Sequence, residues 1–314
     1  MATPQETEEK FARGFAFLSQ RPPDLAQGLN SLMIAANAGH AEAERLLSIY
    51  SAAGFGLPQS WPAAIDRLQR AAERGSPEAR NELRFLAGEA NAQAQDWRGV
   101  RARVDMKALL AVPKMHAVHS SPRIAIVENF ISPEICDWLI ERAKPKLERA
   151  IVFDAEKGTR VDPGRSNSAH HFTLWEKDLV FLLVQNRIAL VTERTLSDME
   201  VPAILHYAVG EEFLPHVDFV STEMPSYAEQ VAAMGQRVVT FLVYLNDDYE
   251  GGETEFPLLD WRHKGRKGDA MFFWSVEPDG APDRRTVHAG LPTTRGEKWI
   301  FSQWIRARPP AYAR

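Results

Sequence analysis

Residues 238–245 read VVTFLVYL, a run of β-branched and aromatic side chains that is typical of a buried β-strand. Two similar runs follow it, AMFFW at residues 270–274 and WIFSQWI at residues 299–305. Turn-forming residues, among them Gly251 and Gly252, separate these runs. Short strands divided by turns predict an antiparallel β-sandwich or barrel for the C-terminal part of the chain.

Helical signals precede these strands. Residues 123–127 (RIAIV) predict one more strand, and Ser132 with Pro133 then marks a helix start, an N-cap serine followed by a proline in the first turn. A second helix is expected from about residue 177 to residue 196. Strands that follow helices in this way indicate an α+β domain whose sheets are supported by helices.

The first third of the chain repeats itself with a period of 36 residues. The segment AANAGH at residues 35–40 returns as AAERGS at residues 71–76. A fixed period in this range is typical of stacked helical pairs. The glycine of each copy, Gly39 or Gly75, is expected to end one helix before the next begins. We therefore expect a small all-α domain at the N-terminal end.

The composition is that of an ordinary globular protein. Hydrophobic residues make up 45% and charged residues 25% of the 314 residues, a length that corresponds to about two domains. The net charge of −5 gives no indication of a nucleic-acid partner, since the phosphate backbone attracts basic surfaces. The single cysteine, Cys136, excludes an intrachain disulfide and a cysteine metal cluster.

The sequence contains no signal for a membrane or for export. No stretch approaches the roughly 18 apolar residues that a membrane-spanning helix needs. Residues 1–20 include early acidic residues and no apolar run of the length found in signal peptides. We therefore expect no membrane partner and a cytoplasmic location.

The segment LPHVDF at residues 214–219 places His216 and Asp218 two positions apart. In an extended strand such side chains point to the same face, so an imidazole and a carboxylate could share one metal ion. A His-x-Asp triplet is common by chance, and it gains meaning from two residues further along. His288 lies 72 residues after His216, and Lys298 opens the last predicted strand.

Two histidines and one carboxylate form the facial triad of non-haem Fe(II) oxygenases, which leaves three positions of the iron open. A 2-oxoacid can chelate through two of these positions, and O2 can take the third. Such a cosubstrate needs a cation for its far carboxylate, and Lys298 supplies a point charge. We therefore predict an Fe(II) site at His216, Asp218 and His288, with Lys298 holding 2-oxoglutarate and no catalytic residue beyond the metal site.

The same segments resemble a known family, the prolyl 4-hydroxylase branch of the 2-oxoglutarate- and Fe(II)-dependent dioxygenases. The resemblance covers roughly residues 122–306, and its segments arrive in the family's order: PRIAIVENFISPEICDWLIERAKPKLE, HYAVGEEFLPHVDF, GQRVVTFLVYLNDDYEGGETEFP, KGRKGDAMFFW and HAGLPTTRGEKWIFSQWI. It implies a double-stranded β-helix, or jelly roll. It also implies hydroxylation of a C–H bond on a prolyl or other residue of a protein or peptide, with ascorbate as reductant.

The resemblance assigns roles residue by residue. The three metal ligands and the lysine keep the roles given above. Two hydroxyl residues would assist the lysine by hydrogen bonding, namely Tyr207 and Thr240. Three residues would face the peptide substrate, namely Arg237, Trp304 and Arg165. Because Arg237 and Thr240 are three positions apart, a regular strand would put them on opposite faces, so a strand cap is the alternative for Arg237.

Three features depart from the family. Phe213 stands where the family often has tyrosine, and residues 220–236 form a loop unlike that of relatives. Because this loop follows closely after the predicted iron ligands, we expect it to shape substrate entry. The pair His170 and His171 would allow a second metal site, but an exposed histidine pair is the favoured interpretation.

The N-terminal repeats resemble Sel-one-like repeats, relatives of the tetratricopeptide family, in the paired alanines, the glycine and the GFGLPQ turn at residues 54–59. This resemblance covers roughly residues 25–90. It implies a surface that recruits another protein, and a helical cap that only supports the fold is the alternative. The expected domains are a helical-repeat domain (1–100), a connector (101–121) and the dioxygenase domain (122–314).

Two other functions are compatible with the sequence. The altered loop is compatible with an enzyme that hydroxylates a free amino acid or another small metabolite. The third hypothesis is an interaction protein whose oxygenase fold is inactive. The intact set of three predicted iron ligands and one lysine argues against that third hypothesis.

Overall fold

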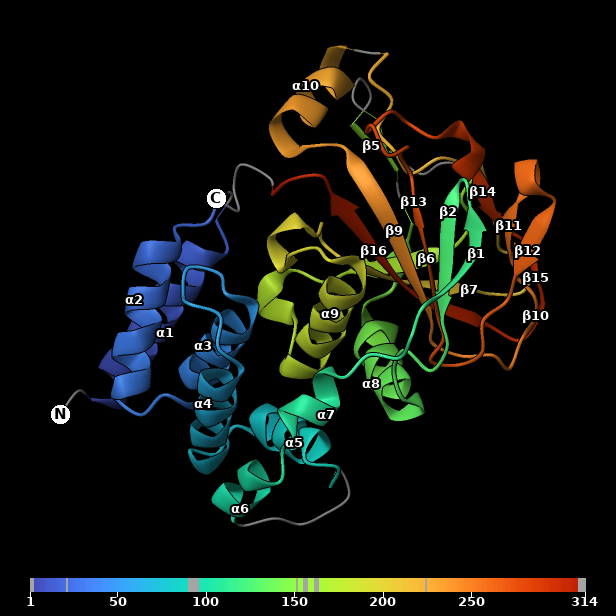
Figure 1. The fold of residues 1–314 in the computed structure, drawn as a ribbon. Helices are drawn as coiled ribbons and strands as arrows, with labels where there is room; N and C mark the ends of the chain where they lie inside the picture. Colours follow the sequence, from blue (N-terminus) through green and yellow to red (C-terminus); the bar gives the residue numbers. More distant parts are fainter. Residues whose placement is uncertain are drawn as a thin grey trace. The chain divides into compact units, whose positions relative to one another are not determined.

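The computed structural model describes residues 3–20, 22–89, 96–150, 152–154, 158–160, 164–223 and 225–309. Internal contacts divide the chain into two compact units, Met1–Ala111 with Leu174–Arg187, and Val112–Thr173 with Ile188–Arg314. Such a division does not test whether a segment folds independently, so the domain boundaries expected from the sequence stay predictions. The first unit is helical, and the described strands belong to the second (Figure 1).

Helices α2 to α5 of the first unit repeat with the 36-residue period of the sequence. The helices of this unit are α1 (Pro4–Leu18), α2 (Leu25–Asn37), α3 (Ala41–Ala53), α4 (Trp61–Glu73), α5 (Pro77–Leu86), α6 (Trp97–Ala102) and α7 (Met106–Leu110). Both ends of α4 lie 36 residues after those of α2, and α5 begins 36 residues after α3. The repeat is therefore present in the structure as two successive helix pairs.

The turn inside each pair has the same geometry in both copies. Gly39 has a φ of 103° and Gly75 a φ of 102°, a conformation that residues with a Cβ atom rarely adopt. The next residue, His40 or Ser76, caps the following helix, because its side chain accepts a hydrogen bond from the backbone N–H three residues on. This turn explains why glycine recurs at the repeat spacing.

The second unit contains an eight-stranded antiparallel sheet. Its strands run in the order β1 (His116–Ser120), β2 (Arg123–Val127), β13 (Ala270–Trp274), β9 (Arg237–Tyr244), β16 (Lys298–Arg306), β7 (Ala203–Tyr207), β6 (Ser168–His171) and β3 (Glu148–Arg149). The three apolar runs of the sequence are neighbours at the centre of this sheet, as β13, β9 and β16. Every residue of β9 after Arg237 is buried, because both faces of the strand are covered.

A smaller antiparallel sheet faces the large one. Its order is β12 (Trp261–His263), β11 (Thr254–Phe256), β14 (His288–Gly290) and β8 (Phe213–His216). Two short pairs complete the strands, β10 (Glu250–Gly251) with β15 (Thr293–Arg295) and β4 (Val152–Asp154) with β5 (Gly158–Arg160). Phe256 of the small sheet shares one buried cluster with Tyr244, Phe273 and Ile300 of the large sheet. The chain is thus α+β, and the two sheets form the expected jelly-roll sandwich.

Helices and short turns flank the strands of the second unit. These are α8 (Pro133–Ala143), α10 (Pro225–Met234) and the 3-10 turns η1 (Lys144–Lys146), η3 (Leu196–Asp198), η4 (Pro257–Leu259) and η5 (Arg284–Thr286). The 3-10 turn η2 (Leu174–Glu176) lies in the first unit, and α9 (Leu179–Thr192) begins in the first unit and ends in the second. Ser132 caps α8 as predicted, accepting a hydrogen bond from the backbone N–H of Ile135.

The interpretation of residues 220–236 as a loop is wrong for residues 225–234, which form α10. None of its residues is buried, so the helix has no apolar stripe that periodicity could reveal. The segment is held at its base by the side-chain amide of Gln236. That amide accepts a hydrogen bond from Val220 N–H at 2.7 Å and donates one to Val220 O at 2.8 Å.

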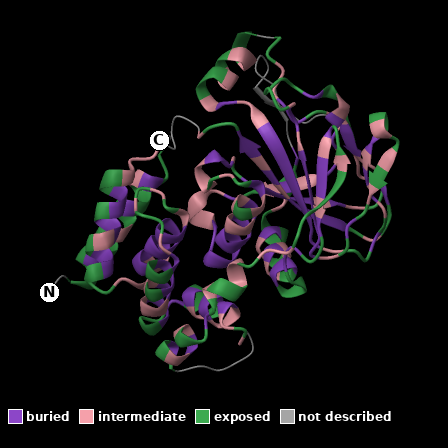
Figure 2. Ribbon diagram, in the orientation of Figure 1, coloured by how far each residue is buried: buried purple, intermediate pink, exposed green. Residues whose placement is uncertain are grey.

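Buried residues concentrate along the central strands and on one side of most helices (Figure 2). The most apolar helix is α9, whose residues 179–184 are all buried. With 14 residues it is shorter than a membrane span requires. No helix in the described part of the chain is both long and apolar enough to cross a membrane.

We predict that Gly75→Ala lowers the free energy of unfolding by about 1–2 kcal/mol, because alanine is strained at this positive φ. The cost is conformational, since a Cβ atom at Gly75 would meet only the tip of Arg80, at 4.0 Å. Gly75→Asn should lose less, because asparagine tolerates the left-handed region better. Urea titration followed by circular dichroism measures both variants. An alanine variant as stable as the parent would contradict the prediction.

Candidate metal centre

The small sheet brings two histidines opposite each other. His216 is the last residue of β8 and His288 the first residue of β14, and the antiparallel pairing of these strands makes the two residues direct partners. Their ring centroids lie 4.3 Å apart. Asp218 follows two residues after His216, on the segment that leaves β8. Residues 72 positions apart in the sequence are therefore neighbours because of one strand pairing.

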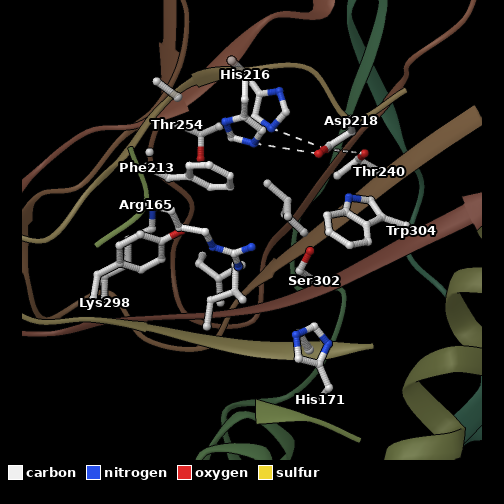
Figure 3. Close-up of a pocket in the computed structure, with 18 of the residues that line it drawn as sticks. Arg165, His171, Phe213, His216, Asp218, Thr240, Thr254, Lys298, Ser302 and Trp304 are labelled. Carbon is white, nitrogen blue, oxygen red and sulfur yellow. Dashed lines mark hydrogen bonds and ion pairs between the residues drawn. The ribbon is translucent and has the colours of Figure 1, made fainter. Parts of the chain in front are cut away.

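The carboxylate of Asp218 faces both imidazole rings. Its Oδ1 lies 3.8 Å from His216 Nε2, and its Oδ2 lies 3.5 Å from His288 Nε2. One ligand atom from each residue lies within 4.8 Å of the others, a spacing that allows one metal ion to bind all three. Asp218 and His216 face each other at one end of the pocket in Figure 3.

The second nitrogen of each imidazole contacts a backbone carbonyl. His216 Nδ1 lies 2.8 Å from Leu214 O, and His288 Nδ1 lies 3.1 Å from Thr286 O. A carbonyl oxygen can only accept, so these contacts place a proton on Nδ1, and in a neutral imidazole Nε2 then carries the lone pair that a metal needs. Hydrogen bonds of this kind orient histidine ligands in metal sites.

The electrostatics of the group favour a cation. Burial lowers the pKa of His216, and the neighbouring His288 lowers it further. Burial alone would raise the pKa of Asp218, but His288, His216 and the hydrogen bond from Thr240 hold that pKa below its usual range. The result is an ionised carboxylate that is 4% exposed. An unpaired buried charge is costly, and a set of two imidazoles and one carboxylate suits Fe(II).

The other histidine pair does not build a second site of this kind. Within the described ranges, no second group of three His, Cys, Asp or Glu side chains has the required spacing. His170 packs edge-on against Phe172, with ring centroids 4.6 Å apart, and it is only partly exposed. His171 is exposed and lines the pocket (Figure 3). The expected exposed pair is therefore exposed at His171 alone.

A pocket opens beside the candidate metal centre, and Lys298 lies in its wall. The lysine is 2% exposed, and burial lowers its pKa to about 8. Its Nζ donates to Gly252 O at 2.6 Å and lies 5.0 Å from the centre of the Tyr207 ring. Tyr207 is also the direct partner of Lys298 across β7 and β16. The lysine and the tyrosine that the resemblance pairs are thus adjacent.

Two threonines of the pocket have different partners. Thr240, expected beside Lys298, donates its hydroxyl hydrogen to Asp218 Oδ2 at 2.7 Å. Thr254 of β11 lines the same pocket, and its hydroxyl lies 3.1 Å from the Tyr244 hydroxyl. Thr254 is not among the site residues predicted from the sequence. The signal was present, since it is the only hydroxyl side chain in the GGETEFP segment.

Of the residues expected to face a substrate, Arg165 and Trp304 line the pocket. Arg165 is 6% exposed, and burial lowers its pKa. Its Nε donates to Asn167 Oδ1 at 2.9 Å, and its guanidinium carbon lies 4.7 Å from the centre of the Phe213 ring. Figure 3 shows this guanidinium beside the Phe213 ring, inside the pocket.

Arg237 is not among the pocket-lining residues. Its Nε and one terminal nitrogen lie 2.6 Å and 2.9 Å from the two carboxylate oxygens of Glu200. Its guanidinium carbon lies 3.7 Å from the centre of the Trp304 ring. In this structure Arg237 therefore lies against Trp304 at the start of β9, outside the set of residues that line the pocket.

Comparisons with known proteins agree with this geometry. The family model of the 2OG-Fe(II) oxygenase superfamily matches residues 202–306. Probable prolyl 4-hydroxylase 3 of Arabidopsis thaliana is 34% identical over 203 residues, which cover 59% of this chain and 69% of the relative. Prolyl 4-hydroxylase 1 of the same plant is 34% identical over 210 residues, which cover 62% of this chain and 72% of the relative.

Among solved structures, the 2OG complex of a viral collagen prolyl hydroxylase from Paramecium Bursaria Chlorella virus-1 is similar to this chain. It shares 28% sequence identity with a TM-score of 0.47, and the match covers 59% of this chain and 96% of the viral one. The superfamily match includes His216, Asp218, His288 and Lys298. The identity and coverage of the plant relatives establish the family. The chain belongs to the 2OG-Fe(II) oxygenase superfamily, as a prolyl 4-hydroxylase-like enzyme that depends on Fe(II) and 2-oxoglutarate.

Proposed function

We propose that the protein hydroxylates a prolyl or another residue of a protein or peptide, with His216, Asp218 and His288 as ligands of its iron. The observation that carries this proposal is the buried Asp218 carboxylate with two imidazole nitrogens facing it, beside a pocket that has Lys298 in its wall. The choice of a prolyl substrate is supported by the plant relatives, which are named prolyl 4-hydroxylases.

Several residues of the chain orient the groups of the site. Bound iron and 2-oxoglutarate would supply the oxidative chemistry, in which O2 and 2-oxoglutarate are consumed, succinate and CO2 are released, and ascorbate restores oxidised iron. The carbonyls of Leu214 and Thr286 keep the two imidazoles turned toward Asp218. Thr240 fixes the carboxylate, and the two sheets keep bulk water away from the reacting C–H bond.

Lys298 is the cation proposed for the distal carboxylate of 2-oxoglutarate. Among the described residues Lys298 Nζ donates to Gly252 O, and an ammonium carries three N–H groups, so others can donate to a ligand. Tyr207 and Thr254 border the same pocket and can add hydrogen bonds to that carboxylate. Thr240 was expected in this role from the resemblance, and its bond to Asp218 makes it the positioning residue of the metal ligand instead.

Hydroxylation of a free amino acid or another small metabolite is the second candidate, and Arg165 favours it. The guanidinium is almost fully buried, and within the described residues it forms no ion pair with a carboxylate. An uncompensated buried cation favours a ligand that carries an anion. The free carboxylate of an amino acid would supply one, whereas an internal peptide residue would offer only a carbonyl oxygen.

We infer that the helical unit recruits a protein target. Its two helix pairs share one turn geometry and one period, and repeats of this kind stack into extended binding surfaces. A helical cap that only supports the fold is the alternative. The cytoplasmic location stays a prediction from the sequence, as does the absence of a nucleic-acid partner.

The function is tested by supplying the full chain with Fe(II), 2-oxoglutarate, ascorbate and air, together with an Ala-Pro repeat peptide or free L-proline. We expect one oxygen atom to appear on proline in the peptide, with one succinate released for each oxygen added. His288→Ala should abolish both signals because it removes one metal ligand. His263→Ala, which alters a histidine outside the pocket, should leave them intact. Succinate release that only free amino acids stimulate would contradict the proposal.

Thr240→Val should weaken Mn(II) binding, used as a redox-stable substitute for Fe(II), by about 10- to 100-fold, because it removes the hydrogen bond to a metal ligand. Thr240→Ser keeps the hydroxyl and should bind Mn(II) like the parent. Isothermal titration calorimetry measures both variants. If Thr240→Val bound Mn(II) normally and lost affinity for 2-oxoglutarate instead, the role expected from the resemblance would be restored.

The affinity for 2-oxoglutarate should fall as the pH rises above about 8. The pKa of ligand-free Lys298 is lowered to about 8, so the ammonium form that pairs with a carboxylate predominates below this pH and is lost above it. We expect the dissociation constant to rise by roughly tenfold per pH unit beyond that point. In Lys298→Arg the charge persists, so this slope should disappear. Titrations at saturating Mn(II) from pH 7 to 9.5 measure the effect, and equal slopes in both proteins would refute it.

A further inference from the structure

Glu200 connects two strands of the large sheet at one end of the pocket. It precedes β7, and its carboxylate accepts both contacts from Arg237 described above. The same carboxylate lies 2.7 Å from Nε of Arg306, whose side chain is 1% exposed. The two arginines hold the pKa of Glu200 below its usual range against the effect of burial, which alone would raise it. Glu200 is thus a partly buried anion shared by two cations.

The backbone of Glu200 is tied to the same strand. Its N–H donates to Trp304 O at 2.9 Å, and its carbonyl accepts from the side-chain amide of Gln303 at 2.7 Å. Both hydrogen bonds end on consecutive residues of β16. The position of Glu200 relative to Trp304 is therefore set through the backbone as well as through the side chain.

The guanidinium of Arg237 completes the connection to the pocket. It lies over the Trp304 ring, with 3.7 Å between the guanidinium carbon and the ring centre. Trp304 lines the pocket and Arg237 does not, so the arginine covers the face of the indole that is turned away from the pocket. Figure 3 shows Trp304 beside Ser302 in the pocket wall. The second face of the indole is left for whatever enters the pocket.

We propose that Glu200 is a positioning residue that, through Arg237, fixes the indole of Trp304 as the wall against which the substrate packs. This inference rests on the proposed function. The occupant of that wall is an uncharged, flat or ring-shaped group, such as a proline ring or a peptide plane, because the charge of Arg237 is compensated by Glu200 and lies behind the indole.

The same cluster holds the segment that departs from the family. Arg306 donates to Gly235 O at 2.6 Å, at the C-terminal end of the α10 segment. Gln236 closes the base of that segment on Val220, two residues after Asp218. One network therefore holds the substrate wall and the α10 segment in a common position. Hydroxylation requires a C–H bond to be held close to the metal, so a small tilt of the wall affects turnover strongly.

The test uses the full chain labelled with 5-fluorotryptophan and observed by fluorine NMR. The chain has eight tryptophans, and Trp304→Phe identifies the line of Trp304 by its disappearance. The main variant is Arg237→Met, which keeps the ion pair of Glu200 with Arg306 and so leaves that partly buried carboxylate paired. Glu200→Gln is the second variant, which removes the carboxylate that holds both arginines.

The chain offers a matched control. Arg123 lies over Trp274 with 4.4 Å between the guanidinium carbon and the ring centre, and neither residue lines the pocket. Arg123→Met therefore removes the same kind of contact at a different place. It should change the line of Trp274 and leave that of Trp304 as it is in the parent.

We expect Arg237→Met and Glu200→Gln to shift or broaden the Trp304 line while Mn(II) and 2-oxoglutarate affinities stay unchanged. With an Ala-Pro repeat peptide as probe, oxygen incorporated per succinate should fall by roughly tenfold or more. A Trp304 line that is unchanged in both variants would overturn the inference. If the parent hydroxylates no peptide but the line still moves, the proposed function fails and the positioning role of Glu200 stands.

Discussion

The buried carboxylate of Asp218 is the constraint on which the site depends. It is 4% exposed and remains ionised, so its charge must be compensated inside the protein. Thr240 contributes one hydrogen bond, and the imidazoles of His216 and His288 face the carboxylate through Nε2. A divalent cation held between this carboxylate and the two imidazoles would compensate the buried charge. The buried charge is therefore a physical reason to propose metal binding at this site.

Each sheet supplies a different part of the site. The small sheet holds both imidazoles, because β8 and β14 pair with His216 opposite His288. The large sheet holds Lys298 at the start of β16 and Thr240 in β9. A shift of one residue in either sheet would turn these side chains to the other face. The buried cluster shared by the two sheets therefore does more than stabilise the fold, since it also fixes the distance between the proposed metal ligands and Lys298, the lysine proposed to hold 2-oxoglutarate.

Local patterns in the sequence predict the strands, the helical repeat and the candidate metal ligands. Contacts between distant segments determine the hydrogen bonds and ion pairs that hold these residues in place. Three features are local patterns: the spacing of His216 and Asp218, the apolar strands and the 36-residue period. They can therefore be predicted from the sequence alone. Two contacts depend instead on how distant segments come together. One is the hydrogen bond of Thr240 to Asp218, 22 residues away, and the other is the ion pair of Arg237 with Glu200, 37 residues away. The helix α10 was not predicted for another reason: none of its residues is buried, so its sequence carries no apolar helical pattern.

The three cations near the pocket show that residue type alone does not define a role. Arg237 is compensated by the carboxylate of Glu200, so it supports the wall and does not select a charge. Within the described residues, Lys298 donates a hydrogen bond to the carbonyl of Gly252, and Arg165 donates one to the side-chain amide oxygen of Asn167. Both are almost fully buried, and burial lowers the pKa of each. If Lys298 holds the distal carboxylate of 2-oxoglutarate as proposed, Arg165 is left without a carboxylate at ion-pair distance among the described residues. Its charge therefore bears on the choice between the two substrate classes, because a free carboxylate would pair with it and an internal peptide bond would not.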